Sequence, residues 1–350
     1  MTSVLDRHAL RSRVQQALEA FVADRRQLLD TIGPELAPLT DALLAYLSGG
    51  KRMRPGFCFW GHLGAGGADT DELVVAAASL ELFQACAIVH DDVMDGSDTR
   101  RGQPAVHRAF AARHREQSWY GDSEAFGAGA AILLGDLALS WADEMLVSSG
   151  LATPPALRVF SEMRADVVGG QYLDLLEQAR RTGTVEAALR VARYKAAKYT
   201  VERPLHLGAA MAGAEPVVLS AYTAYGIPLG EAFQLRDDVL GVFGDPAVTG
   251  KPAGDDLREG KRTALVATAL EKATPAQAAL LDEHLGNPAL DEDGVAALRG
   301  VLVETRAVER VEALIEARTA EALAALDRAP VTEEAREVLR DLAAAATARA

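Results

Sequence analysis

The stretch ELFQACAIVHDDVMDGSDTRR, residues 81 to 101, is the part of the sequence on which the interpretation of the whole chain depends. Residues 74 to 94 are mostly small or apolar and include no glycine or proline, which predicts one buried helix that ends near the next glycine. Asp91 and Asp95 then lie one turn apart on one helix face, with Asp92 beside Asp91. Three carboxylates at the negative end of a helix dipole repel one another, so we expect a cation to offset them.

Magnesium is the cation that fits these ligands, because hard divalent ions prefer oxygen ligands. Mg²⁺ keeps most of its waters in proteins and commonly bridges a few carboxylates to the phosphates of a substrate. A solvated helix end is the alternative explanation, and for a single DDxxD motif it is the more common one. The other motifs of the chain have to decide between the two.

Composition predicts an all-α protein. The 350 residues are 49% hydrophobic but only 5% aromatic, and the abundant alanine, leucine, glutamate and arginine favour helices. We interpret the chain as one large helical domain spanning residues 1–350. The net charge of −14 argues against a nucleic-acid-binding protein, which would carry a basic patch.

The cysteines and the apolar runs of the sequence predict the cellular compartment of the protein. Cys58 and Cys86 both lie in apolar runs, which predicts buried free thiols and a reducing compartment. The first residues lack the apolar run of a signal peptide, and we expect no apolar run of membrane-spanning length. The sequence therefore predicts a cytoplasmic protein without a membrane span.

Helical periodicity and breaking residues divide the chain into segments. Helices are predicted over residues 4–29, 37–47, 53–63, 125–147 and 217–243, and others from Pro154 and from Val185. The polar segment 113–124 is predicted to be a surface loop. Residues 264–350 are predicted to be alanine-rich helices with breaks near Pro275, Pro288 and Pro330.

Two basic clusters lie close in sequence to the first acidic cluster. Lys51, Arg52 and Arg54, in the segment GGKRMRP, come together where a helix is about to begin, an arrangement that suits a phosphate. Arg100 and Arg101 directly follow the aspartates, and arginine binds phosphate through two parallel hydrogen bonds. A solvated basic turn is the alternative for the first cluster. Together the two clusters indicate a polyphosphate ligand.

A second acidic cluster, FQLRDDVLGVFGD, occurs near the end of another apolar helix. Asp237 and Asp238 repeat the first two aspartates of the motif, whereas Gly241 stands where the third would be. Asp245 lies about one turn farther on. Between the two clusters, Asp174 lies in an apolar helix and therefore needs a partner.

The order of these motifs resembles that of the trans-isoprenyl diphosphate synthases, also called polyprenyl synthetases. The resemblance runs from Gly49 to Thr263, with GGKRMRP before the first acidic helix and GK and GKRT after the second. It implies a prenyltransferase with small-molecule diphosphate substrates. It also implies the all-α isoprenoid synthase fold, a homodimer, and two aspartate motifs that face each other across a deep central cavity.

The resemblance implies a role for each matching residue. Three Mg²⁺ ions are expected, two held by Asp91 and Asp95 and the third by Asp237. The supporting aspartates are Asp92, Asp238 and, one layer farther from the metal, Asp174. The catalytic cations matched to the allylic diphosphate are Arg100, Lys195 and Lys251. The residues matched to the isopentenyl diphosphate pocket are Lys51, Arg54, Gln84 and Arg101, and those matched to further substrate-binding positions are Gln234 and Lys261.

Three positions depart from the family pattern. Gly241 replaces the third aspartate of the second motif, and we expect this loss to be tolerated because the first aspartate of the pair makes the metal contact. Ala196 stands where many relatives have threonine, and we expect Lys198 or Thr200 to compensate. Gln84 stands where many bacterial relatives have histidine, and either residue can donate to a phosphate oxygen.

The implied reaction is the Mg²⁺-dependent head-to-tail condensation of isopentenyl diphosphate with an allylic diphosphate. One rival is a class I terpene cyclase, which shares DDxxD but binds no second diphosphate; GGKRMRP and the second aspartate pair argue against it. The other rival is a non-catalytic partner subunit of a synthase, which Gly241 leaves open.

The first acidic helix also predicts the length of the product. Phe83, Ala87 and Asp91 are successive i, i+4 positions, so a chain anchored at the aspartates should run past Ala87 toward Phe83. In the family, aromatic residues at the positions of Cys86 and Ala87 stop growth at C15. Both are small here, which predicts geranylgeranyl diphosphate, C20. C15 stays open if another helix supplies a bulky side chain, and C25 or longer if Phe83 turns aside or serves only core packing.

Overall fold

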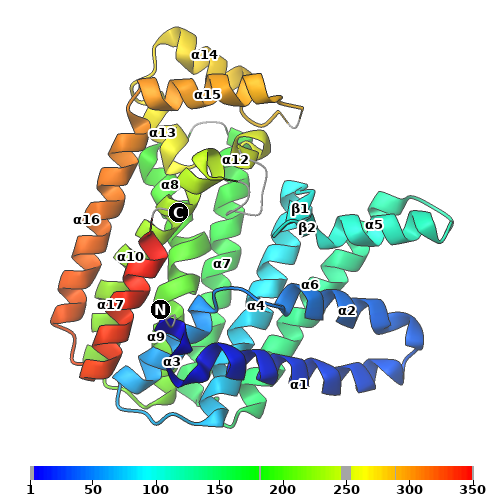
Figure 1. Cartoon of the computed structure of the whole chain (residues 1–350), viewed down its shortest axis with the longest axis vertical. Coiled ribbons are helices and arrows are strands. Elements are labelled where there is room, and N and C mark those ends of the chain that lie inside the picture. The colour runs from blue at the N-terminus through cyan, green and yellow to red at the C-terminus, as the bar shows by residue number, and fades with distance from the viewer. Residues whose placement is uncertain (1–3, 181–182, 246–253, 288, 349–350) are drawn as a thin grey trace. The chain divides into compact units, whose positions relative to one another are not determined.

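The computed structural model describes residues 4–180, 183–245, 254–287 and 289–348. These residues are almost entirely helical (Figure 1). The strands found among them, β1 (Thr99–Arg100) and β2 (Gln103–Pro104), pair antiparallel as a small hairpin. The prediction of an all-α protein is confirmed.

The chain forms two compact units. Unit 1 comprises Met1–Phe160, Pro204–Leu219 and Pro330–Leu342. Unit 2 comprises Ser161–Arg203, Ser220–Ala329 and Ala343–Ala350. The single domain over residues 1–350 stays a prediction.

Unit 1 is built around α4 (Asp71–Asp95), the helix predicted from the first acidic cluster. The hydroxyl of Thr70 caps its start by accepting a hydrogen bond from the N–H of Leu73 at 3.2 Å, and Gly96 ends it at φ 68°. The helix packs along α6 (Ser123–Ser148), as Figure 1 shows. Its side chains are largely buried, and each large apolar one contributes roughly 1.5–3 kcal/mol. The predicted buried helix and its boundary are confirmed.

Unit 1 contains further helices. They are α1 (Leu10–Asp30), α2 (Ala37–Leu47), α3 (Met53–Gly64), α5 (Val106–Glu116), the first turns of α7 (Pro154–Arg180), most of α9 (Arg203–Met211) and most of α17 (Glu333–Thr347). Of these, α1, α2, α3 and α5 contact α4. Short 3-10 turns precede α1 at Val4–Ala9 and α2 at Pro34–Leu36.

The first helix starts later than the periodicity predicts. His8 and Ala9 adopt the left-handed backbone, with φ 58° and 51°, so the regular helix begins at Leu10 rather than at residue 4. The His8 ring stabilises this turn, because its Nδ1 lies 2.7 Å from the Asp69 Oδ2. Its ring also packs edge-on against Trp60, with centroids 5.5 Å apart. These contacts join segments far apart in sequence, which periodicity does not reveal.

The surface loop predicted over residues 113–124 is shorter in the structure. The helix α5 runs to Glu116 and α6 begins at Ser123, so the prediction is wrong for the ends of this segment. His114, which is 5% exposed, packs its ring against Trp119 and Phe126, with centroids 5.9 and 5.2 Å away. This aromatic cluster supports helical structure that the polar composition did not favour.

Two helices reach membrane-spanning length, contrary to the expectation from the sequence. By length and composition alone, α4 and α6 are apolar enough to cross a membrane. In the most apolar 18-residue stretch of α4, 72% is buried, as in the core helix of a folded protein. In the corresponding stretch of α6, 39% is buried. Cys58 and Cys86 are free and buried, as predicted, and burial raises the pKa of Cys86 to about 12.

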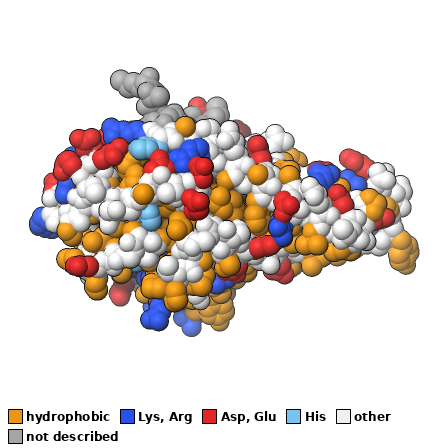
Figure 2. Space-filling model, turned by 90° about the horizontal axis from the view of Figure 1, so that it is seen from below, with side chains coloured by type: hydrophobic (Ala, Val, Ile, Leu, Met, Phe, Trp, Pro, Cys, Tyr) orange, Lys and Arg blue, Asp and Glu red, His pale blue; other side chains and the backbone are white. Residues whose placement is uncertain are grey.

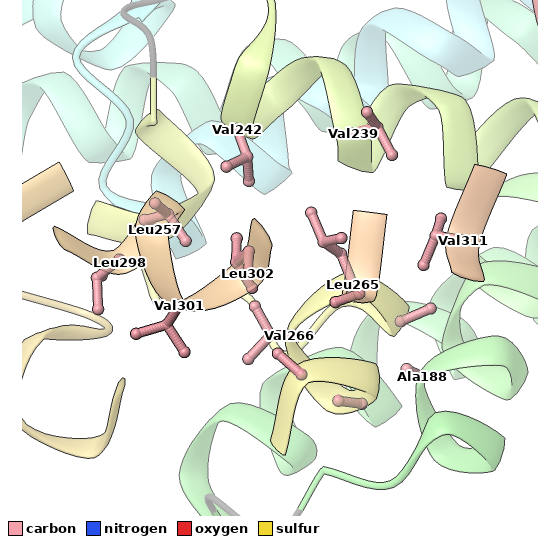
Figure 3. Packing of buried hydrophobic residues seen from close by; sticks show 14 of the residues in the cluster. Ala188, Val239, Val242, Leu257, Leu265, Val266, Leu298, Val301, Leu302 and Val311 are labelled. Carbon is pink, nitrogen blue, oxygen red and sulfur yellow. The ribbon is translucent and has the colours of Figure 1, made fainter. Parts of the chain in front are cut away.

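Unit 2 is organised around α10 (Pro216–Phe243), most of which belongs to it. Its hydrophobic core includes Val239 and Val242 near the end of this helix, and Figure 3 shows Val242 near Leu257 of α12 (Asp255–Glu259). The other helices are the rest of α7, α8 (Val185–Val191), α13 (Ala264–Leu270), α14 (Pro275–His284), α15 (Glu292–Glu304), α16 (Ala307–Asp327) and the end of α17.

The helix predicted to start at Val185 changes its geometry after α8. Residues Ala192–Glu202 form a π-helix, and the N–H of Arg203 bonds to the carbonyl oxygen of Lys198, five residues back. Such helices are rare and are often found at functional sites. No feature of the sequence predicted it.

Candidate active site

The first acidic cluster lies at the carboxyl end of α4. Asp91 and Asp95 are partly exposed, whereas Asp92 is only 1% exposed. The Asp92 carboxylate accepts hydrogen bonds from Arg100, whose Nε lies 3.0 Å from Oδ1. The β1–β2 hairpin positions Arg100, because the chain turns back directly after the helix with the Ser97 N–H bonded to the Asp92 carbonyl at 3.0 Å. The buried Asp92 therefore holds Arg100 in place at the end of α4.

The pairing with Asp92 keeps Arg100 charged. Burial is the largest single influence and lowers the pKa of Arg100. The charge and hydrogen bond of Asp92, together with the charges of Tyr46 and Asp91, outweigh it, so the net shift of the pKa is upward. The side chain stays 19% exposed, so part of its fork of N–H donors remains available to a ligand. A guanidinium fixed beside partly exposed aspartates suits a diphosphate that also contacts a metal ion.

Arg101 lies beside the basic segment that precedes α3. Its Nη1 donates to the carbonyl oxygen of Tyr46 at 3.1 Å, and its guanidinium lies 5.1 Å from the centroid of the Tyr46 ring. A Cβ on Gly50 would lie 3.7 Å from the same guanidinium. Lys51, which is exposed, directly follows Gly50, and Arg54 lies in the first turn of α3. The structure thus brings Arg101 to the segment that carries the two other cations matched to isopentenyl diphosphate.

Arg52 is used differently from its neighbours. It is 4% exposed, pairs with the Glu81 carboxylate of α4, and donates to the side chain of Gln15 and the carbonyl oxygen of Leu47. Its charge is therefore neutralised inside unit 1, contrary to the expectation that it joins a phosphate grip. The pair holds the start of α3 against α4, one turn before the partly buried Gln84.

A pair of phenylalanines lies on the amino-terminal side of the first cluster. Phe83 and Cys86 are 3% and 5% exposed, whereas Ala87 is partly exposed. The Phe83 ring lies against the ring of Phe160 of α7, with centroids 6.1 Å apart and planes tilted by 59°. Phe83 lies just over two helical turns before Asp91, or about 12 Å along the helix axis. Sequence analysis missed Phe160, because no local pattern links a phenylalanine on α7 to α4.

The second acidic cluster lies near the end of α10. Asp237 is exposed and Asp238 is 7% exposed. The Nε2 of Gln234 donates to the Asp238 Oδ1 at 2.7 Å. Burial raises the pKa of Asp238 to about 8; the hydrogen bond from Gln234 opposes this shift, and the charges of Asp256 and Asp237 add to it. A cation beside this pair would favour the charged carboxylates.

Asp256 of α12 lies beside the position of the missing third aspartate. A Cβ on Gly241 would collide with the Asp256 Oδ2 and lie 2.6 Å from its Cγ. The N–H of Gly254 donates to the Gly241 carbonyl at 3.2 Å, and Leu257 belongs to the same core cluster as Val242 (Figure 3), so α12 is held at the end of α10. The role of Asp256 was not predicted, although the acidic pair in GDDLREGKRT was a signal that could have pointed to it.

Two lysines were expected after the second cluster. The Nζ of Lys261 lies 3.5 Å from the Asp256 Oδ1 and 2.5 Å from the Glu259 Oε2. This places a cation directly beside the acidic group at the end of α10. Lys251 lies outside the described residues.

Lys195, on the π-helix, is the partner that Asp174 needs. Its Nζ donates to the Asp174 Oδ2 at 2.6 Å, and Asp174 itself is 8% exposed. The side chain of Lys195 is 23% exposed, so the ammonium group keeps access to a ligand.

The neighbours of Ala196 do not support the expected compensation for its missing hydroxyl. Lys198 lies 3.4 Å from Asp166 and 3.3 Å from Glu202, so its charge is shared between two carboxylates. Thr200 is 1% exposed. Lys198 is thus committed to two carboxylates and Thr200 is buried, so neither supports the expected compensation.

Each acidic cluster can supply some, but not all, of the ligands of a magnesium ion. Within the described parts of the chain, no three carboxylate, imidazole or thiol groups are arranged to hold a metal by themselves. Mg²⁺ needs no such cage, because it takes one or two carboxylates and completes its shell with water and substrate phosphate. The partly exposed Asp91, Asp95 one turn later with its carboxylate oxygens buried, and the exposed Asp237 in unit 2 can supply carboxylates in this number.

Comparison with known proteins agrees with the motifs and the fold. A sequence profile of the polyprenyl synthetase family matches residues 37–302. The chain is 33% identical over 300 residues to the geranylfarnesyl diphosphate synthase of Aeropyrum pernix, covering 83% of this chain and 88% of that one. It is 32% identical over 295 residues to the (2E,6E)-farnesyl diphosphate synthase of Mycobacterium bovis, covering 81% and 77%.

A solved structure is similar over nearly the whole chain. It is the geranylgeranyl pyrophosphate synthase of Corynebacterium glutamicum complexed with isoprenyl diphosphate and magnesium, with a TM-score of 0.93 and 43% identity over 97% of this chain and 98% of that one. The chain belongs to the polyprenyl synthetase family and has the isoprenoid synthase fold. It is therefore a prenyltransferase, from a family that binds isoprenyl diphosphates and uses Mg²⁺. These relatives are named for different products, so the family does not determine the product length.

Proposed function

We propose that this chain condenses isopentenyl diphosphate head to tail with an allylic diphosphate, with geranylgeranyl diphosphate, C20, as its main product. The observation that carries the product length is the contact between Phe83 and Phe160. Small residues at Cys86 and Ala87 leave room where an aromatic side chain would stop the product at C15. Phe83 would stop the growing chain one helical turn farther from the aspartates than an aromatic residue at position 87. One turn of about 5.4 Å accommodates one more isoprene unit.

The aspartates would hold the metal ions in this reaction. Asp91 and Asp95 would bind two Mg²⁺ and Asp237 a third, supported by Asp92, Asp238 and Asp174. Bound Mg²⁺ would neutralise the diphosphate leaving group and so promote ionisation of the allylic substrate. The basic residues proposed for the allylic diphosphate are Arg100, Lys195 and Lys251. Those proposed for isopentenyl diphosphate are Lys51, Arg54, Gln84 and Arg101, with Gln234 and Lys261 as further contacts.

Preorganised charge is the main contribution of the protein to the proposed chemistry. Breaking the allylic carbon–oxygen bond leaves a carbocation and a diphosphate. The double bond of isopentenyl diphosphate attacks the cation, and the new carbocation passes a proton to the released diphosphate. Arg100 and Lys195 are already held by Asp92 and Asp174, so their charges need little reorganisation when the leaving group forms. Apolar walls such as those at Phe83 and Phe160 would keep water from the cation.

We also propose that the chain forms a homodimer through α6. Phe126, Ile132, Leu133 and Val147 of this helix are 39%, 46%, 63% and 56% exposed. Figure 2 shows that hydrophobic side chains do reach the surface of the molecule among charged ones. Several exposed apolar side chains on one helix are typical of an interaction surface. Leu133→Glu should therefore shift the mass measured by analytical ultracentrifugation from dimer to monomer, whereas a monomeric native chain would contradict the proposal.

One incubation tests the reaction and its rivals. The purified chain is mixed with Mg²⁺, labelled isopentenyl diphosphate and dimethylallyl, geranyl or farnesyl diphosphate, and the products are separated by chain length. A labelled C20 diphosphate supports the proposal, and a C15 or longer main product overturns its length. A cyclic hydrocarbon from a single allylic substrate would instead identify a class I terpene cyclase. Complete lack of elongation would favour a partner subunit that works only beside an active synthase.

A further inference from the structure

The π-helix of unit 2 carries Lys195 and Lys198, and its neighbours approach it unusually closely. A π-helix has more residues per turn than an α-helix and is correspondingly wider. An adjacent helix can therefore approach its backbone closely only where that helix has a very small residue. The positions of such residues identify what holds this segment in place.

On α7 the space is made at Gly170. A Cβ there would collide with the backbone nitrogen of Lys195 and lie 2.6 Å from its Cα. Asp166 and Asp174 lie one turn to either side of Gly170 on the same face of α7. Both pair with the π-helix: Asp174 with Lys195 at 2.6 Å, and Asp166 with Lys198 at 3.4 Å. The close approach and the two ion pairs therefore form one contact.

On α10 the space is made at Gly226 and Gly230. A Cβ on Gly230 would lie 2.6 Å from the Cα of Ala197, and one on Gly226 would lie 2.9 Å from the Cα of Glu202. Gly230 lies about two helical turns before Asp238 of the second acidic cluster on the same helix. The helix that carries the acidic cluster therefore contacts the helix that carries Lys195 through these glycines.

We infer that Gly170, Gly226 and Gly230 are positioning residues that together form a seat for the π-helix and thereby fix Lys195 beside Asp174. Glycine inside a helix is less stable than alanine, so three glycines at these contacts in two long helices indicate that the close approach outweighs this loss. The seat rests on geometry alone. Its consequence for the allylic diphosphate rests on the role of Lys195 in the proposed function.

Two adjacent glycines of α7 provide a matched pair of variants. A Cβ on Gly169 would meet no atom within 4 Å, whereas one on Gly170 would meet the backbone of Lys195. Gly170→Ala should accelerate amide hydrogen exchange in the segment Ala192–Glu202, and Gly169→Ala should leave it unchanged. This measurement needs no substrate. It therefore tests whether Gly170 holds the π-helix in place even if the proposed reaction is not observed. Equal exchange in the two variants would overturn the inference.

Steady-state kinetics tests whether the seat acts through Lys195. Gly170→Ala should lower kcat/KM for dimethylallyl diphosphate roughly tenfold, the size expected for one weakened charge-assisted contact, with KM for isopentenyl diphosphate nearly unchanged. Lys195→Ala should do the same, and the double variant should be no worse than either single one. Additive losses would show that Gly170 acts elsewhere and would overturn this part.

A milder variant covers the case in which Gly170→Ala does not fold. Gly226→Ala brings its Cβ to 2.9 Å from the Cα of Glu202, a less severe approach than at Gly170, and the same exchange and kinetic measurements apply to it. Circular dichroism confirms that each variant is folded before it is compared. A folded Gly226→Ala variant with native exchange in Ala192–Glu202 and native kinetics would overturn the inference.

Discussion

The carboxylate of Asp256 lies against Gly241, in the space that a side chain at position 241 would take. Its charge also acts on Asp238, whose pKa it helps to raise. The second acidic cluster has lost the third aspartate of its motif, but the helix that follows supplies negative charge at nearly the same place.

Asp256→Asn should therefore weaken metal binding. We expect the Mg²⁺ concentration for half-maximal activity to rise roughly tenfold, because removing one nearby charge costs about 1–2 kcal/mol at a partly exposed site. Asp255→Asn removes the same charge from the adjacent residue of α12 and is the matched control, with an expected change below about twofold. If both variants have the same Mg²⁺ dependence as the native chain, Asp256 has no part in the site.

The two aspartate clusters should respond to substitution unequally. Asp91→Ala and Asp95→Ala should each lower kcat by orders of magnitude, because each removes a ligand whose charge stabilisation is worth several kcal/mol. Asp237→Ala should be damaging as well, and Asp245→Ala far less so. Turnover of labelled isopentenyl diphosphate measures all four. Should Asp245→Ala prove as harmful as Asp237→Ala, the reduced motif uses Asp245 as a ligand.

Product length should change when the phenylalanine contact is altered from either side. Phe83→Ala and Phe160→Ala each remove one ring of the pair and should lengthen the product beyond C20. Ala87→Phe places a ring one turn nearer the aspartates and should shorten the product to C15. Chromatography of the labelled products gives the length directly. An unchanged product length in all three variants would show that other residues set the product length.

The buried pair of Arg52 and Glu81 should matter for stability rather than for substrate binding. Removing one partner of a buried ion pair leaves the other unpaired, so Arg52→Leu should lower the free energy of unfolding by roughly 3–5 kcal/mol. Arg26→Ala is the control, because Arg26 pairs with Asp41 at the surface and such pairs contribute about 0–1 kcal/mol. Urea denaturation measures both. Losses of equal size would show that burial adds nothing to this pair.

The sequence by itself determined the features that depend on local patterns. The apolar run before Asp91 and the stop at Gly96 define the end of α4 and place two aspartates one turn apart. The order of basic and acidic motifs along the chain is enough to indicate the family. These features follow from helical periodicity and from the chemistry of short segments, both of which are readable along the chain.

Only the tertiary structure decided which side chains meet. Arg52 and Lys51 are neighbours in one basic segment, yet Arg52 is buried against Glu81 while Lys51 is exposed. Phe160 meets Phe83, and Asp256 lies beside Gly241, across separations that no local pattern spans. The π-helix likewise depends on glycines of two other helices. Burial, pairing and close backbone approach arise from packing between distant segments, so the sequence contains the residues but not the contacts between them.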